Sequence, residues 1–447
     1  MTEDDVALAF EAFNQGRIEE TSALCGRLLQ TAPAPALMLL GLIAKRRGRF
    51  DEAAVQLERS VRIAPNPKAL ASLADCLWRT GRLTEGLRYI EEFIAGQPEN
   101  AEARLLAAAL LHGLGRFDAA LGEVMRAQAL QPKSHLVEAR WGCILTELGQ
   151  YEDAERHFRA AARLEPAFRH CGLINFRRGV WREVEPRLDA PAPEELALLR
   201  PASIERPYDA VVAAFCDAQY FYKYGVTFVN SYAKNAGPGR LLHLHILDPD
   251  REFASHLGKL VARLALSNIA ATYEYAPMDD SADFNLRRTF YSCARFLRLN
   301  SLLAHYGTTV ACFDIDTVFE SPLDDMMAGL GNDDVGLVRR EPRDSPWLDI
   351  VANIVIARNT QPAVRYFSAV SSYIRHFLRR GKLYWHLDQI ALYCVLKMME
   401  RFAQPPRIGW LAPDARAAVW HIGSPYDFRL EDERVARYQL ADLVPHA

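Results

Sequence analysis

The chain lacks the cysteine pattern of a zinc site or of a disulfide framework. Its eight cysteines are scattered singly and form no Cys-x-x-Cys pair. No apolar run reaches the roughly 20 residues that a membrane-spanning helix needs. The first ten residues, "MTEDDVALAF", are acidic where a secretion signal is basic. We therefore expect a cytoplasmic protein without a membrane span.

Long runs of charge of one sign are also missing. The formal net charge is −3, and the charged residues are spread along the chain. Proteins that bind nucleic acid concentrate basic residues on one face, so nucleic acid is not expected as the main partner. The 447 residues, half of them hydrophobic, are enough for two or three domains with sizeable cores.

The first 168 residues carry a regular period. Glycines recur at intervals of 32 to 34 residues, and prolines follow with the same step. Between them lie phrases of one type, such as "GRFDEAAVQLERSVRIAP" and "GQYEDAERHFRAAARLEP". A helix ends near each glycine, the next starts at the acidic residues, and proline stops it. The marker residues are Gly16, Gly48, Gly81, Gly115 and Gly149, with Pro33, Pro65, Pro98, Pro132 and Pro166.

A small residue follows four of these glycines at a fixed distance, at Ala53, Gly86, Ala120 and Ala154. The pattern resembles the tetratricopeptide repeat over about five units. The first unit, with Thr21 at the small position, has the character of a terminal cap. The resemblance implies a superhelix whose concave groove binds a peptide or a partner protein. A rigid spacer or a dimerisation surface remains an open alternative.

From Tyr208 the pattern changes to strands alternating with helices. This alternation predicts an α/β domain with a mostly parallel sheet. The proline-rich segment before it predicts a linker with one short helix. We thus expect a repeat array over 1–168, a linker over 169–207 and an α/β domain over 208–447. The expected strands are 208–216, 241–248, 269–276, 308–314, 334–339 and 351–357, and the helical stretches include 224–235 and 251–267.

Two aspartates end one of these strands. In "TTVACFDIDTVFESPLDDM", Asp314 and Asp316 follow a run of apolar residues. Desolvating two like charges costs several kcal/mol unless something pairs with them. In parallel sheets, ligands bind beyond the carboxyl ends of the strands. The pair therefore indicates a metal site, although a solvated strand end before a helix cap at Ser321 is the structural alternative.

Five further phrases accompany the aspartates in a fixed order. They are "FCDAQYFYKYGVTFVNSYAKN", "YSCARFLRLNSLLAHYG", "ANIVIARN", "HLDQIALY" and "VWHIGSPYDF". Together they resemble the glycogenin-like and lipopolysaccharide-galactosyltransferase-like family of sugar-nucleotide glycosyltransferases, over roughly Tyr208 to Phe428. The resemblance implies a GT-A fold, a divalent-cation-dependent and retaining transfer, and a uridine diphosphate sugar as donor.

The same resemblance implies a metal site and a catalytic pair. Asp314, Asp316 and His421 would bind Mn²⁺ or Mg²⁺, and Asp388 and Gln389 would lie beside the reacting carbon. The leaving diphosphate gains negative charge, which a bound cation stabilises. Oxygen ligands suit such an ion, and one histidine nitrogen is compatible with Mn²⁺. His421 can reach the aspartates only if the C-terminal segment folds back toward them.

The resemblance also implies the donor contacts. Asp217 and Tyr220 would hold the base and ribose, Arg295 the diphosphate or sugar, Asn353 the sugar, and Gly423 belongs to the last motif. Each has a structural alternative that stays open. Asp217 could cap a turn, Arg295 could be a surface charge, and Asn353 could be a turn residue.

The sequence differs from the family pattern in one motif, and several residues allow another interpretation. The phrase "HIGSPYDF" lacks the family's spacing and its phosphate-binding lysine, whose role Arg429 could take. Asp388 could mark a helix start, and His243 and His245 are expected to be structural. The phrase "DIDTVF" also partly matches haloacid-dehalogenase-like phosphatases, whose first aspartate is a nucleophile. A further alternative is a repeat scaffold with a degenerate glycosyltransferase-like domain.

Overall fold

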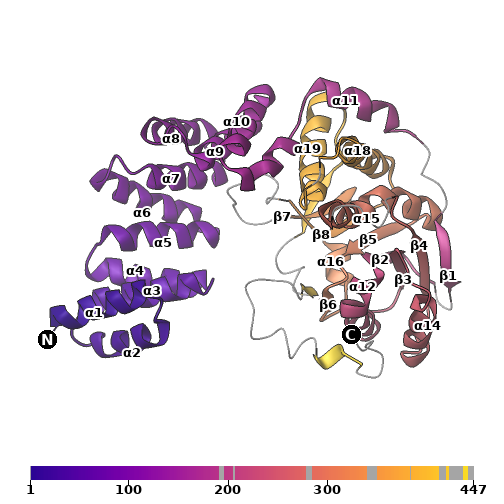
Figure 1. Ribbon diagram of the computed structural model, residues 1–447, viewed down its shortest axis with the longest axis horizontal. Helices are drawn as coiled ribbons and strands as arrows, with labels where there is room; N and C mark the ends of the chain where they lie inside the picture. The colour runs from indigo at the N-terminus through magenta and orange to yellow at the C-terminus, as the bar shows by residue number, and fades with distance from the viewer. Residues whose placement is uncertain are drawn as a thin grey trace. The chain divides into compact units, whose positions relative to one another are not determined.

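A computed structural model of the chain describes residues 2–190, 196–204, 207–277, 284–339, 350–382, 384–411, 419–421 and 436–440. The described chain divides into two compact units (Figure 1). The first, here called the repeat unit, ends at Gly172, and the second, the α/β unit, begins at Leu173.

The repeat unit is a series of antiparallel helix pairs. Each glycine that marked the sequence period has a positive φ, between 70° and 77°, just after a helix end. Glycine adopts this left-handed conformation without the strain of a Cβ atom, so the helix stops there and the next begins. The helices are α1 (Thr2–Asn14), α2 (Ile18–Leu28), α3 (Pro33–Arg46), α4 (Phe50–Ile63), α5 (Pro67–Arg79), α6 (Leu83–Gly96), α7 (Ala101–Gly113), α8 (Phe117–Leu130), α9 (His135–Glu147) and α10 (Tyr151–Leu164).

Small residues let these helices approach closely. Ala53, Ala120 and Ala154 are fully buried. A Cβ atom at Gly142 of α9 would lie 2.7 Å from the ring of Phe158 on α10, and one at Gly86 would lie 2.8 Å from Leu110. The core of the repeat unit is therefore set by side-chain volume at the helix crossings.

The segment expected to be a linker, 169–207, contains regular structure in the part that is described. A 3-10 helix spans Pro166–Leu173, α11 spans Arg178–Val184, and the short helix η2 spans Glu185–Arg187. Strand β1 (Ala197–Ser203) pairs antiparallel with β4. Most of this segment thus belongs to the α/β unit rather than lying between units.

The α/β unit is built on one sheet of eight strands in the order β1-β4-β3-β2-β5-β8-β7-β9. Each of the six expected strands is present. The strands are β2 (Ala210–Asp217), β3 (Arg240–Leu247), β4 (Ile269–Glu274), β5 (Thr309–Phe313), β7 (Val335–Arg339), β8 (Ile350–Ala357) and β9 (Ile408–Leu411), and a second small sheet joins β6 (Thr317–Phe319) to β10 (Val419–His421).

The expectation of a mostly parallel sheet needs correction, because the sheet is mixed. Strands β4, β3, β2 and β5 are parallel neighbours, but β8 is antiparallel to both β5 and β7, and β1 is antiparallel to β4. Continuous apolar runs such as β8 are buried on both faces whatever their direction, so the sequence pattern does not reveal the direction.

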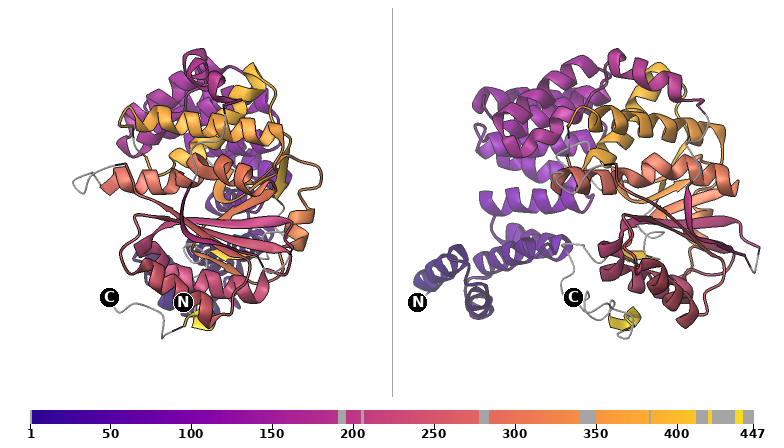
Figure 2. Two further views of the ribbon diagram at one scale, coloured as in Figure 1. Left: turned by 90° about the vertical axis from the view of Figure 1, so that its right-hand side faces the viewer. Right: turned by 45° about the vertical axis from the view of Figure 1, so that its right-hand side comes forward.

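Helices cover both faces of the sheet (Figure 2). One layer contains α13 (Val226–Asn235) and α14 (Phe253–Arg263), and the other contains α15 (Phe284–Tyr306), α18 (Gln361–Leu378) and α19 (Leu387–Phe402). Strands β2 and β3 are buried along almost their whole length between these layers. Such burial holds their carboxyl ends in fixed positions.

The close helix crossing at Gly142 leads to the first prediction. Gly142→Ala should lower the thermal midpoint of the repeat unit by an amount that corresponds to about 1–3 kcal/mol, because the added methyl group overlaps a buried ring. Gly26→Ala is the control, because Gly26 is a helical glycine with nothing within 4 Å of the added Cβ. It should stabilise by about 0.5–1 kcal/mol. Equal effects of the two substitutions would contradict this packing.

Candidate functional site

Acidic residues gather where the parallel strands of the α/β unit end. Asp217 is the last residue of β2, Asp248 follows β3, and Asp314 follows β5. The connection from β2 leads to β3 on one side, whereas β5 pairs with the other side of β2. This arrangement is a topological switch point, beyond which open α/β sheets bind their ligands.

The two aspartates of the Asp-x-Asp phrase lie in a tight turn. Strand β5 ends at Phe313, and the Thr317 amide donates to the Asp314 carbonyl over 3.1 Å. The Asp314 amide donates to the Asn353 carbonyl of β8, also over 3.1 Å. The extended strand ends at Phe313, one residue before Asp314. The alternation of side chains along a strand, which would point both carboxylates the same way, therefore does not apply to Asp314 and Asp316.

Arg295 of α15 is the principal cation among these acids. Its Nη1 lies 2.6 Å from Asp314 Oδ1 and donates to the Ala352 carbonyl over 2.8 Å. Burial lowers the pKa of Arg295, but the charges of Asp314 and Asp388 outweigh it and the net shift is upward. Only 12% of the side chain is exposed, so Arg295 is not the solvated surface charge of the structural alternative.

Asp316 and Asp388 carry the largest acid–base perturbations of the site. Burial, followed by the charge of Asp314, raises the pKa of Asp316 to about 7. Burial also raises the pKa of Asp388 to about 7, although the charge of Arg295 opposes the shift. Asp388 stands in the first turn of α19 and accepts from the Gln389 amide over 2.9 Å. Two carboxyl groups that titrate near neutrality in one place are typical of functional sites.

Asp217 and Tyr220 form the turn that leaves β2. Asp217 Oδ1 accepts from the Tyr220 amide over 2.7 Å, so it does cap a turn. The chain continues through a π-helical turn, Phe221–Gly225, a geometry often found at functional sites. Burial raises the pKa of Tyr220, and the charge of Asp316 is the next cause, which places this ring near the acidic pair. The ring packs against Tyr224 and stays 42% exposed.

Asn353 lies at an irregular part of β8. The register between β7 and β8 shifts after Leu337, so residues 352–354 bulge beside the site. Bulges often occur next to active sites, where they redirect a side chain. The buried Oδ1 of Asn353 has no hydrogen-bond partner among the described residues. Asn353 is part of a strand rather than of a turn.

The C-terminal segment does return to the site. Strand β10 pairs antiparallel with β6, and His421 lies opposite Thr317, the residue after Asp316. The side chain of His421 and the whole of Gly423 lie outside the described residues. Among the described residues no group of three His, Cys, Asp or Glu side chains could hold a metal.

Asp248 is the site residue that the sequence analysis missed. Its φ is +49°, a strained conformation for a residue other than glycine. Its two carboxylate oxygens accept from the Ala276 amide over 2.8 Å and from the Tyr291 hydroxyl over 2.6 Å. Its place at the end of "LLHLHILD", the strand beside β2, was the signal in the sequence.

His243 and His245 are structural, as expected. Thr272 of the neighbouring strand lies within 2.9 Å of a ring nitrogen of each histidine. Burial lowers the pKa of His243 to about 3, so this ring stays neutral.

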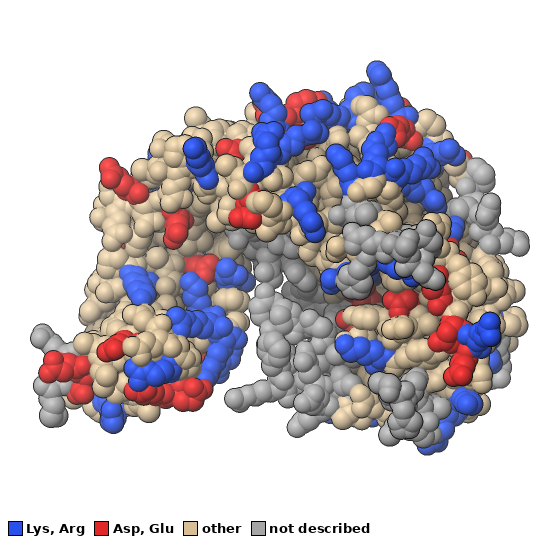
Figure 3. All heavy atoms as spheres, in the orientation of Figure 1, with Lys and Arg blue, Asp and Glu red and all other residues tan. Residues whose placement is uncertain are grey.

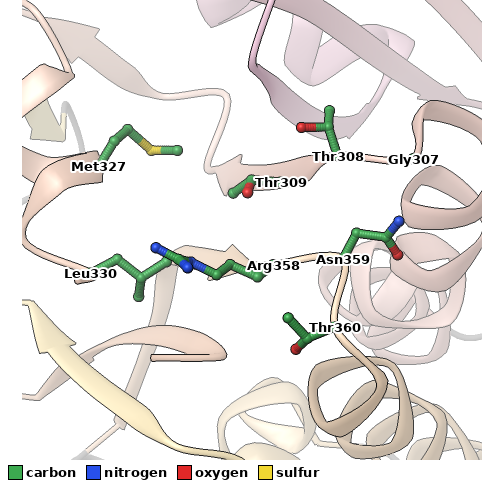
Figure 4. A pocket seen from close by; sticks show the side chains of 8 residues that line it. All are labelled: Gly307, Thr308, Thr309, Met327, Leu330, Arg358, Asn359 and Thr360. Atoms are coloured by element: carbon green, nitrogen blue, oxygen red, sulfur yellow. The ribbon is translucent and has the colours of Figure 1, made fainter. Parts of the chain in front are cut away.

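A separate small pocket, of about 300 Å³, opens at the opposite end of β5 (Figure 4). Thr308 and Thr309 line it at the start of that strand, and Arg358 and Asn359 line it just beyond the end of β8. Because Asp314 follows the other end of β5, the pocket is not part of the acidic site.

Comparisons with known proteins concern the repeat unit. Two family models described as tetratricopeptide repeat match residues 38–87, 71–135 and 140–168. The chain is 24% identical over 192 residues to the TPR repeat-containing thioredoxin TTL4 of Arabidopsis thaliana, over 38% of this chain and 28% of that protein. It is 30% identical over 102 residues to the inactive TPR repeat-containing thioredoxin TTL3 of the same plant, over 22% of this chain and 15% of that protein.

Several solved structures are similar to a part of the chain. MamA AMB-1 is 22% identical, with a TM-score of 0.34, over 37% of this chain and 98% of that one. YrrB, described as a TPR protein with an unusual peptide-binding site, is 18% identical, with a TM-score of 0.35, over 37% and 87%. The chain spans less than a third of the curated relatives. The tetratricopeptide repeats expected over the first 170 or so residues are confirmed by the family models.

The buried carboxyl group of Asp388 leads to a prediction about pH. Its pKa is about 4 in an unfolded chain and about 7 when folded, so its contribution to stability is fully present below pH 4 and is lost as the pH rises through 7. At pH 8 the free energy of unfolding of Asp388→Asn should therefore exceed that of the parent by an amount on the order of a few kcal/mol. The difference should vanish near pH 4.

Urea unfolding at pH 4, 6 and 8 measures this difference. Asp325→Asn is the control, because Asp325 is an exposed aspartate of α16 (Asp324–Ala328). A parent-like pH profile for Asp388→Asn would show that the carboxyl group is not perturbed by burial.

Proposed function

We propose that the α/β unit is a divalent-cation-dependent glycosyltransferase that uses a nucleotide diphosphate sugar. The observation that supports this most directly is the position of Asp314 and Asp316. Both follow β5 beside the topological switch point, and the pKa of Asp316 is raised to about 7. The order of the sequence phrases supports this reaction class through the family resemblance, and the contacts among Arg295, Asp314 and Asn353, which come from three of those phrases, are consistent with one shared site.

The residues present fit a cation that is shared with a ligand. Asp316 forms no ion pair within the described part of the chain, and the buried Oδ1 of Asn353 lacks a hydrogen-bond partner there. Mg²⁺ is commonly held by one or two carboxylates, with substrate phosphates and waters completing its shell. Asp316 and Asp314 would hold Mn²⁺ or Mg²⁺, and His421 is the proposed third ligand. The ion, when bound, would stabilise the negative charge of the leaving diphosphate.

Arg295 and Asp388 would act on the two charges that develop in the reaction. The guanidinium of Arg295 is fixed by Asp314 and by the Ala352 carbonyl, so it can present positive charge without reorganising. Glycosyl transfer passes through an oxocarbenium-like transition state, which a nearby carboxylate stabilises. Asp388 supplies that carboxylate above pH 7, with Gln389 next to it. Retention of configuration is proposed from the family resemblance alone.

The donor base and ribose are assigned to the turn after β2. Tyr220 offers a half-exposed ring near the acidic pair, and Asp217 fixes the backbone of that turn. We assign Asn353 to the sugar, and Gly423 to the donor as part of the last motif. Uridine is the proposed base.

The repeat unit is assigned to the acceptor. Tetratricopeptide arrays present extended concave surfaces, and the donor-type phrases all fall after Tyr208. The proposed acceptor is a protein or peptide that the array holds.

A repeat scaffold with an inactive α/β unit is the second candidate. The observation in its favour is that Asp314 is already paired with Arg295 at 2.6 Å. A carboxylate that serves only to neutralise a buried arginine needs no metal.

Asp316 decides between these two candidates. With Mn²⁺ present, the parent should bind uridine diphosphate, and Asp316→Asn should bind it at least tenfold more weakly, because the site loses one of the two carboxylates that would hold the cation. Calorimetry with and without EDTA is the measurement, and Asp325→Asn is the control. A ligand present at 100 times its dissociation constant should stabilise the parent by about 2.7 kcal/mol.

Other outcomes favour the scaffold or change the donor. If the parent protein binds no nucleotide in the presence of Mn²⁺, the proposal that the α/β unit is an enzyme is wrong. If the guanosine, adenosine or cytidine diphosphate binds more tightly than uridine diphosphate, the proposal of an enzyme stands, but uridine is not the base of its donor.

The role of the repeat unit has its own test. Removal of residues 1–172 should abolish transfer to the natural acceptor and leave hydrolysis of the donor at the parental rate, because the two units have separate cores. Circular dichroism and cooperative unfolding check that the remaining unit is folded. Normal transfer by the folded, truncated protein would show that the array does not present the acceptor.

A further inference from the structure

Basic side chains gather on one part of the α/β unit. Figure 3 shows Lys and Arg spheres over the region where Figure 1 places α11 and α18, with a few Asp and Glu spheres among them. Helix α18 packs against α15 and against η2. The charges of Arg298 on α15, Arg379 just after α18 and Arg187 on η2 each act on half-buried Arg375 of α18, and Arg187 and Arg379 themselves are exposed.

Acidic groups do not balance this cluster. Glu274, at the end of β4, is the carboxylate that acts on Arg375. Glu274 is already engaged, because it accepts from Arg298 Nε over 2.8 Å and lies 3.3 Å from His245 Nε2. These hydrogen bonds outweigh its burial and lower the pKa of Glu274 to about 2, so the group is ionised. Glu274 thus pairs with Arg298, whereas Arg187, Arg375 and Arg379 form no ion pair among the residues that the structure describes.

Two other arginines, one in α18 and one just after it, form structural ion pairs. Arg365 lies 3.2 Å from Asp189, and Arg380 lies 3.0 Å from Glu183. Arg375 instead donates only to the Ser371 hydroxyl over 3.4 Å, and neither it nor Arg379 forms an ion pair within the described ranges. Arg375 is half-buried, and burial is the largest cause that lowers its pKa, followed by Arg298. A half-buried cation among like charges is unfavourable unless an anion joins it.

We propose that Arg187, Arg298, Arg375 and Arg379 form a binding site for a phosphate-bearing small molecule. The planar guanidinium group donates two parallel hydrogen bonds to phosphate oxygens, which makes arginine the preferred residue for this recognition. Three uncompensated charges in a compact cluster match one multiply charged phosphate group. The long basic stripe that nucleic acid requires is missing from the sequence.

The site flanks the acidic edge of the sheet but is distinct from it. Glu274 ends β4, which is two strands from β2 in the sheet. Neighbouring strands lie about 4.8 Å apart, so the arginine cluster begins roughly 10 Å from Asp217 along the sheet. Binding at the arginines needs no divalent cation, and the inference holds whether or not the α/β unit transfers sugars.

Calorimetry with inorganic pyrophosphate in EDTA tests the proposal on the full chain. The parent should bind, and the affinity should fall as salt is added. Arg375→Gln with Arg379→Gln should bind at least tenfold more weakly, which corresponds to about 1.4 kcal/mol. Arg27→Gln with Arg59→Gln removes two exposed arginines of the repeat unit and should bind as the parent does. Asp316→Asn should also bind as the parent does, which separates this site from the proposed donor site.

A stability measurement separates binding from a structural role. Arg379→Gln alone should unfold at or above the parental temperature without ligand, because it relieves repulsion, and it should still lose affinity for pyrophosphate. A clear fall in the unfolding temperature together with the loss of affinity would overturn the proposal. So would a parent that does not bind in EDTA, or a double variant that binds normally. Binding to anionic phospholipid vesicles that pyrophosphate does not displace would replace the small molecule with a membrane surface.

Discussion

The site of the α/β unit depends on one buried cation. Arg295 lies between Asp314 and Asp388 and is tied to the backbone at Ala352. Three parts of the chain that are far apart in sequence, α15, the turn after β5 and the start of α19, are thereby held together. Removing the cation would leave buried carboxylates without compensation, a situation that typically costs 3–5 kcal/mol. The raised pKa values of Asp316 and Asp388 arise because this one cation does not neutralise all the acids around it.

Negative and positive charges are in excess at two different places of the α/β unit, and each excess suggests which kind of ligand binds there. Beyond β2 and β5 the acids are in excess, and an additional cation would be favourable there. Beyond β4 the arginines are in excess, and an additional anion would be favourable there. The acids follow buried strands, which fix their positions, whereas the arginines belong to η2, α15 and the end of α18, and the sheet contributes Glu274 to their surroundings. A rigid sheet can hold such repelling charges at separations that a loop would relax.

The repeat unit could be predicted closely from sequence, and the α/β unit only in part. Each repeat contacts mainly its neighbours, so glycine, proline and small residues at a fixed period specify the helices locally. For example, Gly48 needs a positive φ and Gly86 allows close helix packing, and the period of the sequence marks both positions. The six expected strands were also identifiable, because each is an apolar run bounded by turn residues. The direction of β8 and the pairing of β1 with β4 were not, because each depends on a partner strand that lies from 41 to 76 positions away in the sequence, beyond the reach of any local pattern.

The sequence by itself determined the repeats, the alternation of strands and helices, and the placing of Asp217 and Asp314 at strand ends. It determined them because period, burial and turn chemistry act over a few residues. Only the tertiary structure decided that Arg295 pairs with Asp314, that residues 352–354 bulge beside this pair, and that β10 returns to β6. It also revealed the strained Asp248 and, among the described residues, the lack of an ion pair at Arg375 and Arg379. These features arise from contacts between distant segments, whose energies are decided by burial and by the balance of charge in three dimensions.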